Sequence, residues 1–137
     1  MKNYQHPVII NILTIFALIF FSNLSFAKGL NSDELKALIN DKTVESESSR
    51  GFAAKTYYSP DGSFRRIKRG ESIKGVWYIN SDGKICKKVD GESTAACRLI
   101  VKEGSVWKSY KIPSKPTNPW KHKGTWLKIL DGNPSNL

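Results

Sequence analysis

The chain of 137 residues has the length of a single domain, which excludes a multidomain organisation. It carries 22 Lys or Arg against 12 Asp or Glu, a formal net charge of +10 at pH 7, so we expect attraction to acidic partners. His122 is the one histidine beyond the N-terminal segment and lies far in sequence from either cysteine. Composition therefore predicts neither a metal site nor a bound cofactor.

The start of the chain has the pattern of a secretory signal peptide. A short basic head precedes an apolar run over residues 8–21, and the small residues Ser25 and Ala27 match the cleavage site of a signal peptidase. The competing interpretation is a retained anchor, but the run is shorter than the roughly 20 residues that a spanning helix needs. We expect removal of residues 1–27, a mature domain over residues 28–137 without a membrane span, and a periplasmic or secreted location.

A short helix is expected at the start of the mature chain. Asn31 can accept a hydrogen bond from a free backbone N–H while Glu34 reaches back, which is a capping-box arrangement. Leu35, Leu38 and Ile39 then fall on one face at helical spacing. This helix should pack on a sheet or plug its end.

From Lys42 onward the pattern changes to short strands with tight turns. Gly62, Gly83 and Gly104 are spaced evenly and each falls in an expected hairpin turn. The sequence predicts an antiparallel meander that closes into a barrel of about eight strands. The expected strands cover residues 43–47, 53–59, 63–69, 73–80, 84–89, 95–102, 105–112 and 125–130.

The stretch 74–111 holds both cysteines, and its register can be predicted from the turns. A two-residue turn at Asp82-Gly83 would place Ile79 opposite Cys86. In an exported chain a disulfide is favoured over free thiols, and it would place Cys86 opposite Cys97. The expected core face then carries Trp77, Ile79, Cys86, Cys97, Leu99, Val101, Val106 and Tyr110. The opposite face keeps the apolar Val76, Tyr78, Ile85, Ile100 and Trp107, so either the helix covers it or a bulge shifts the register.

The segment 113–124 interrupts the strand pattern. Pro113, Pro116 and Pro119 favour extended polyproline geometry and exclude central-strand pairing. We expect a long loop that crosses the barrel end. Trp120 would either fold back over the barrel mouth, the favoured alternative, or stand exposed as an anchor for a sugar, a lipid or a partner.

With these elements placed, the chain resembles a family of exported bacterial proteins that has no established activity. The resemblance covers residues 30–134 and is carried by an ELxxLIxxxTV opening at residues 34–44, a YxxDG motif at 58–62 and a GxW motif at 75–77. It continues with DGxxC at 82–86, the second cysteine at 97 and DGNP at 131–134. It implies a small calycin-like (lipocalin-like) barrel and the pairing of Cys86 with Cys97, and it implies no activity.

Basic residues supply the main candidate site. The expected ligand-binding residues are Arg65, Arg66, Lys68, Arg69, Trp120, Lys121, His122 and Lys123. Alternate residues of a strand face opposite ways, so the run at 65–69 cannot form one single-sided patch. Solubility and protection of an edge strand explain these charges as well as attraction to a polyanion does.

No catalytic constellation is visible, and we expect no enzyme. His122 has no neighbouring nucleophile, and Glu45 and Glu47 lie in a polar stretch with nothing to desolvate them. The leading expectation is a non-enzymatic module that binds an anionic cell-envelope ligand or an acidic protein, with nucleic acid a less favoured polyanion. The alternative is an accessory or inhibitor protein that contacts a periplasmic enzyme. The sequence sets no oligomeric state.

Overall fold

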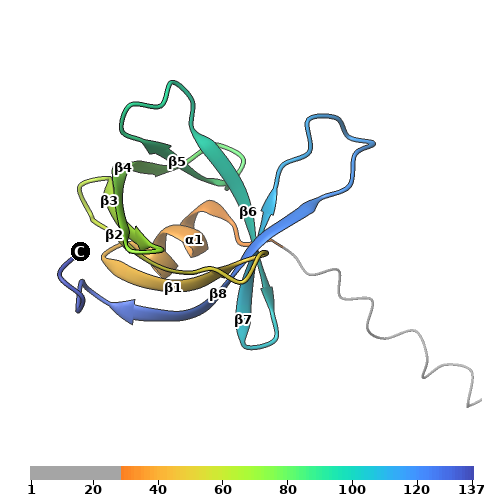
Figure 1. Cartoon of the computed structure of the whole chain (residues 1–137). Coiled ribbons are helices and arrows are strands. Elements are labelled where there is room, and N and C mark those ends of the chain that lie inside the picture. Colours follow the sequence, from red (N-terminus) through yellow and green to blue (C-terminus); the bar gives the residue numbers. More distant parts are fainter. Residues whose placement is uncertain (1–28) are drawn as a thin grey trace, which may run out of the picture.

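The computed structural model describes residues 29–137, and these form a closed antiparallel barrel in which consecutive strands are neighbours (Figure 1). The expected signal peptide lies outside the described residues. The elements are α1 (Ser32–Ile39), β1 (Lys42–Ser48), β2 (Ala53–Tyr58), β3 (Ser63–Lys68), β4 (Glu71–Ile79), β5 (Ile85–Val89), β6 (Ala96–Glu103), β7 (Val106–Lys111) and β8 (Lys121–Asp131). The mainly β prediction of eight strands and one short helix is confirmed. No described helix has both the length and the apolar composition that crossing a membrane requires.

The helix α1 closes one end of the barrel. Its capping box forms as predicted, since the Glu34 backbone N–H donates to the Asn31 side chain and the Asn31 N–H donates to the Glu34 carboxylate, each at 2.9 Å. Leu35 and Ile39 are fully buried and belong to the same hydrophobic cluster as Tyr58 and barrel residues of other strands. The helix contacts β1 and β4 and lies within the outline of the barrel in Figure 1.

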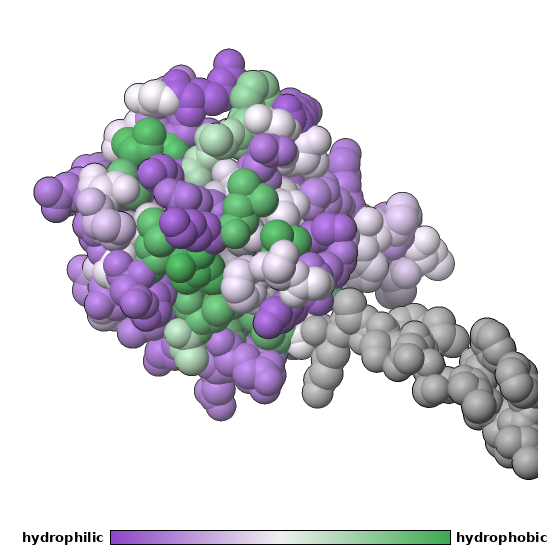
Figure 2. Space-filling model, turned by 90° about the horizontal axis from the view of Figure 1, so that it is seen from below, coloured by the Kyte–Doolittle hydropathy of each residue, from purple (hydrophilic) through white to green (hydrophobic). Residues whose placement is uncertain are grey.

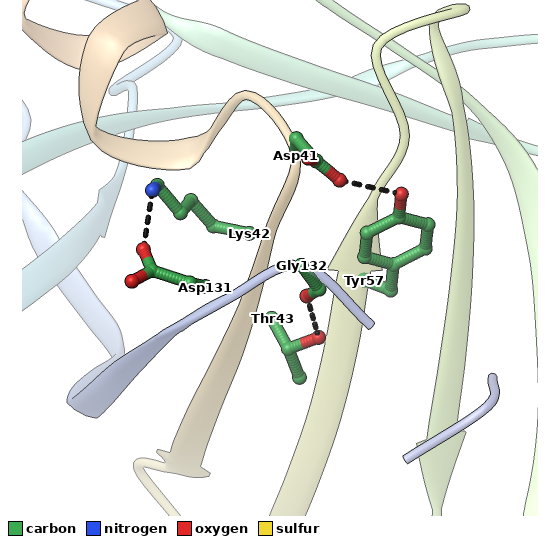
Figure 3. Close-up of polar contacts among 6 residues, drawn as sticks. All are labelled: Asp41, Lys42, Thr43, Tyr57, Asp131 and Gly132. Atoms are coloured by element: carbon green, nitrogen blue, oxygen red, sulfur yellow. Dashed lines mark hydrogen bonds and ion pairs between the residues drawn. The ribbon is translucent and has the colours of Figure 1, made fainter. Parts of the chain in front are cut away.

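The first and last strands are joined at this closed end by a set of polar contacts (Figure 3). The Thr43 hydroxyl donates to the Gly132 carbonyl at 2.7 Å, and the Gly132 N–H donates to the Asp41 carbonyl at 2.8 Å. Lys42 forms an ion pair with Asp131, and the Tyr57 hydroxyl donates to the Asp41 carboxylate at 2.8 Å. The residues after β8 therefore complete the barrel.

The two ends of the barrel differ in their connections. Gly62, Gly83 and Gly104 all have positive φ, at 86°, 70° and 61°, and lie in the turns that follow β2, β4 and β6. Every second turn of a meander lies at the same end, so the even glycine spacing places all three at the α1 end. The loops after β1, β3, β5 and β7 lie at the opposite end, which we call the mouth.

The predicted register of β4 and β5 is wrong by one residue. Residues 80–84 form a longer loop instead of a two-residue turn, because the Asn80 side chain accepts from the backbone N–H groups of Asp82 at 3.1 Å and Lys84 at 2.9 Å. Ile79 consequently lies opposite Ile85, and not Cys86. A slip of one residue moves every side chain of a strand to the other face.

The expected core face therefore needs correction. Trp77 and Ile79 do face the barrel interior, but Cys86 lies opposite the exposed Tyr78 and points outward. The same holds on β6 and β7, where Leu99 pairs with Tyr110 and Val101 pairs with Lys108 on the outer side. The residues that face the interior of β5, β6 and β7 are Ile85, Lys87, Val89, Ala96, Arg98, Ile100, Trp107 and Ser109.

The disulfide is confirmed, although its position in the barrel wall differs from the prediction. Cys86 and Cys97 are direct partners in the register of β5 and β6, and their sulfur atoms are bonded. The bridge lies on the outer side of the wall, with Cys86 fully buried and Cys97 half-buried. It closes a ring across the loop at residues 90–95.

The loop between β7 and β8 does not cross the barrel end. It projects away from the barrel (Figure 1), and its residues 114–120 are all exposed. Strand β8 begins at Lys121, earlier than predicted, so the loop is shorter than expected. Trp120 is 47% exposed and does not fold back over the mouth.

Candidate functional site

A cavity of about 260 Å³ lies inside the barrel. Its floor is apolar, formed by Phe64, Ile85, Ile100 and Trp126, and its wall reaches the exposed Phe52 at the mouth. The remaining lining residues are Ser46, Glu47, Ser48, Ala54, Arg66, Lys68, Ile73, Lys87, Val89, Glu92, Ala96, Arg98, Ser109, Lys123 and Gly124. The cavity is therefore closed by the core beneath it and open at the mouth.

Three cationic side chains enter this cavity from the strands β3, β5 and β6. Arg66 follows the buried Phe64 on the inner face of β3, and Lys87 follows the buried Ile85 on the inner face of β5. Arg98 precedes the buried Ile100 in the same way on β6, which runs in the opposite direction. Each cation therefore lies one inward position closer to the mouth than an apolar residue of the floor.

These cations have no carboxylate partner. The ion pairs found among residues 29–137 are Lys42–Asp131, Lys55–Glu45 and Lys108–Glu103, and none of them includes a residue that lines the cavity. The Arg66 Nε is the one buried side-chain nitrogen or oxygen of the described chain without a hydrogen-bond partner. Arg98 donates from one terminal nitrogen to the Cys97 carbonyl at 2.8 Å, which leaves further N–H groups of its guanidinium for other acceptors.

The Lys87 side chain lies against aromatic rings of the barrel interior. Its ammonium donates to the Tyr58 hydroxyl at 3.3 Å and lies 5.7 Å and 5.9 Å from the ring centroids of Tyr58 and Phe64. Burial, together with the charges of Arg66, Arg98 and Lys68, lowers the pKa of Lys87 to about 7. At neutral pH this group therefore exists as a mixture of ammonium and free amine.

Burial and the neighbouring Arg66 also lower the pKa of the Arg98 guanidinium. Both lowered pKa values have the same two causes, the loss of water and the proximity of like charges. Lys123, at the rim, has its pKa lowered first by desolvation and then by Lys121 and Arg98. The interior is a region of positive potential that a bound anion would relieve.

Acidic residues occur in the lining only at its edge. Glu47 and Glu92 contribute to the cavity wall, and both are exposed. Neither forms an ion pair with Arg66, Lys87 or Arg98. The charge inside the cavity is thus dominated by cations, five of which appear among the lining residues: Arg66, Lys68, Lys87, Arg98 and Lys123.

The structure brings together three of the eight predicted ligand-binding residues. Arg66, Lys68 and Lys123 line the cavity, while Arg65 is exposed on the outer face of β3. The other four also lie outside the cavity. They are Arg69 in the turn after β3, stacked 4.8 Å from the Phe52 ring; Trp120 in the projecting loop; Lys121 at the start of β8; and His122, whose ring contacts Tyr110.

Sequence reasoning missed Lys87 and Arg98. The predicted core face included Cys86 and Cys97, and by alternation this placed the adjacent Lys87 and Arg98 on the outer face. A signal was present, because Lys87 alternates with Ile85 and Val89, and Arg98 alternates with Ala96 and Ile100. Strand residues that alternate with apolar ones share their face, so these basic residues belonged to the apolar side.

The outer surface differs in kind from the cavity. A second hollow of about 480 Å³ lies over β1, β2 and β3 beside the C-terminus, and it includes Ile67, Leu127 and Leu137. The Lys55–Glu45 ion pair, 2.9 Å long, lies in this hollow, which also includes Arg69. Figure 2 shows hydrophobic side chains scattered among charged ones on the face seen from below. The interior differs from this hollow in that Arg66, Lys87 and Arg98 converge on one cavity.

The arrangement in the cavity can bind a small anion through guanidinium and ammonium groups, with apolar contacts beneath it. Among the described residues, no three His, Cys, Asp or Glu side chains are grouped in a way that could hold a metal ion. The sequence matches no protein-family model and no curated protein.

Proposed function

We propose that this protein is an exported, non-enzymatic binding protein whose barrel cavity holds a small anion or the anionic end group of a cell-envelope molecule. The observation that carries the proposal is the convergence of Arg66, Lys87 and Arg98 on one cavity without a carboxylate partner. Buried charges are normally paired, because an unpaired one costs several kcal/mol of stability. Arg66, Lys87 and Arg98 are half-buried and lack a carboxylate partner, so the protein gains from an anion that neutralises them.

The volume of the cavity limits the ligand. One water molecule in the liquid occupies about 30 Å³, so 260 Å³ corresponds to roughly nine waters. This is slightly below the usual range of about 300–1,000 Å³ for ligand pockets. A ligand of roughly ten heavy atoms fits, whereas a polymer could insert only a terminal group.

The chemistry of the lining limits it further. Arg66 offers a planar fork that matches a carboxylate or phosphate, and its Nε lacks an acceptor within the protein. The floor of Phe64, Ile85 and Trp126 favours an apolar portion behind the charged group. We therefore expect a small organic carboxylate or phosphate to bind more tightly than an inorganic anion.

Calorimetry at low and high salt tests this proposal with benzoate, phenyl phosphate and inorganic phosphate as probes. Both organic anions should bind, and their affinity should fall as salt is added. Replacement of Arg66 by Met removes a charged hydrogen-bond donor, worth about 1.5–3 kcal/mol, and should weaken binding about tenfold or more.

The matched control is Arg65→Met, one residue away on the outer face of β3, which should bind as the native protein does. Lack of binding by every probe at low salt would refute the proposal, and so would equal losses in the two variants. Phosphate-terminated envelope fragments, compared with free phenyl phosphate, distinguish an end group from a free small molecule.

The projecting loop supports a second candidate, a contact with a partner protein. Trp120 is 47% exposed at the end of the loop, directly before β8, and the loop residues that precede it are also exposed. Tryptophan is frequent among residues that dominate binding energy. A pull-down in which native protein captures one periplasmic protein and the Trp120→Ala variant does not would favour this candidate. Retention of capture by the variant would exclude a role for Trp120.

A further inference from the structure

Lys87 has a position that anion binding alone does not require. Its amino group lies at the floor of the cavity, against the rings of Tyr58 and Phe64 and within 3.3 Å of the Tyr58 hydroxyl. Arg66 and Arg98 bring two guanidinium groups to the cavity, which suffice to hold an anion. A primary amine beneath them, in an apolar pocket, is an arrangement suited to covalent chemistry with a carbonyl group.

We propose that Lys87 captures the carbonyl group of a bound oxo acid as an imine, with Arg66 and Arg98 holding the acid group. The capture rests on the anion binding proposed above, because the two guanidinium groups would position the ligand. It identifies the ligand class as small acids with a carbonyl carbon next to the acid group, such as 2-oxo acids. In these molecules the carboxylate and the carbonyl are adjacent, and the two guanidinium groups and the amine line the same cavity.

Two conditions make an amine nucleophilic, and Lys87 meets both. It must be unprotonated, and its pKa of about 7 leaves roughly half of it as the free amine at pH 7. It must also be reachable, and it is among the residues that line the cavity. Desolvation and neighbouring cations are the usual means by which proteins activate a lysine for imine formation.

The cations that surround this amine favour its neutral form. Arg66, Arg98 and Lys68 repel a proton on Lys87, and burial raises the pKa of the Tyr58 hydroxyl, so it stays neutral. The remaining charged groups of the lining are Lys123, Glu47 and Glu92, at the rim. A carboxylate bound to the guanidinium groups would cancel part of the repulsion and so raise the pKa of Lys87 in the complex. The fraction of free amine, and with it the rate of the reaction, should therefore increase as the pH rises from 7 to 9.

The bond changes balance without an oxidant or reductant. The nitrogen lone pair of Lys87 attacks the carbonyl carbon, the C–N bond forms, and the π electrons of the carbonyl move to its oxygen. That oxygen takes up a proton, for which the Tyr58 hydroxyl is the nearest donor within the protein, and gives a carbinolamine. The nitrogen returns a proton to the Tyr58 phenolate. The hydroxyl group on carbon then leaves with the remaining N–H proton as water, which gives the C=N bond of the imine, and hydrolysis reverses these steps.

Reductive trapping tests the capture. The protein is incubated with pyruvate and sodium cyanoborohydride, and the adduct is located by intact mass and peptide mapping. Native protein should acquire one adduct, with Lys87 labelled at least tenfold more than Lys88, its exposed neighbour on the outer face of β5. Excess benzoate should suppress the labelling of Lys87 by competing for the guanidinium groups.

Two variants make the result decisive. Lys87→Met should abolish the preferred adduct, while Lys88→Met should keep it. If calorimetry shows pyruvate binding without an adduct at Lys87, the capture is refuted and anion binding stands. If the adducts are spread evenly over surface lysines, the capture is also refuted. If no anion binds and Lys87 is unlabelled, both proposals fail.

Discussion

Replacement of Lys87 by Met should make the stability of the protein less dependent on pH in a defined direction. The folded-state pKa of Lys87 is about 7, whereas the ordinary value is 10.5. Between these values the unfolded chain holds a proton that the folded chain has lost, so stability rises with pH across this window. The free-energy cost of holding Lys87 inside the barrel is therefore present almost in full at pH 7 and below, and this cost declines as the pH approaches 10.5.

The size of the effect follows from the gap between the two pKa values. At about 1.36 kcal/mol for each pKa unit, this gap sets an upper limit of about 5 kcal/mol. Water in the open cavity reduces this figure, and about 2–3 kcal/mol is a reasonable expectation. The variant also leaves the buried Tyr58 hydroxyl without Lys87 as partner, a loss of about 1–3 kcal/mol that does not vary with pH below its own titration.

Urea unfolding at pH 6 and pH 10 separates these contributions. We subtract the unfolding free energy of the native protein from that of Lys87→Met at each pH. This difference should be about 2–3 kcal/mol larger at pH 6 than at pH 10. Lys88→Met, on the outer face of the same strand, should show a difference that is constant within about 0.5 kcal/mol. A constant difference for Lys87→Met as well would refute the placement of its amine in a desolvated, cation-rich interior.

Two further outcomes follow from the barrel wall. Replacement of Cys86 and Cys97 by Ala should lower the unfolding free energy by about 3 kcal/mol, because the bridge closes a ring of about a dozen residues and so restricts the unfolded chain. Thermal unfolding followed by circular dichroism measures this loss, and an unchanged midpoint would show that the bridge adds no stability. Gly75→Ala should destabilise the barrel by about 2 kcal/mol or more, because the added Cβ would meet the Lys88 carbonyl oxygen at 2.1 Å. Gly91→Ala is the comparison, since its Cβ meets nothing within 4 Å and the strain of its φ of +85° acts alone; a smaller loss at Gly75 than at Gly91 would contradict the close approach.

The strands and the helix of this fold could be predicted because their signals are local. The Asn31 and Glu34 cap needs only residues three apart, and each strand ends at a glycine or proline turn. Alternation of apolar and polar residues then specified a meander. An antiparallel meander of this many short strands removes its exposed edges by closing into a barrel, which is why the architecture was predicted from the sequence.

The interior could not be predicted, because it depends on the conformation of one loop. Two side-chain hydrogen bonds from Asn80 lengthen the connection between β4 and β5, and the face of every residue on β5 changes with it. Lysine and arginine on strands are mostly exposed, and this general tendency outweighed the alternation of Lys87 and Arg98 with apolar residues. The prediction failed where charged residues occupy positions that stability alone would fill with apolar ones.

The disulfide lies on the same pair of strands as two cations of the cavity, Lys87 and Arg98. Strands β5 and β6 are paired only through Ile85–Arg98, Cys86–Cys97 and Lys87–Ala96. Lys87 and Arg98 are therefore diagonal neighbours across the most briefly paired strands of the barrel, roughly 7–8 Å apart at the backbone.

The like charges of Lys87 and Arg98 repel each other. The Cys86–Cys97 bond joins the residue pair between the Ile85–Arg98 and Lys87–Ala96 pairs and holds the two strands together. Such a bond is expected where a binding site places repulsion inside a short strand pair. It follows that a bound anion should recover part of the stability lost on reduction of the disulfide. Benzoate should accordingly raise the unfolding temperature of the reduced protein at least as much as that of the oxidised protein, and a smaller rise would separate the bridge from the site.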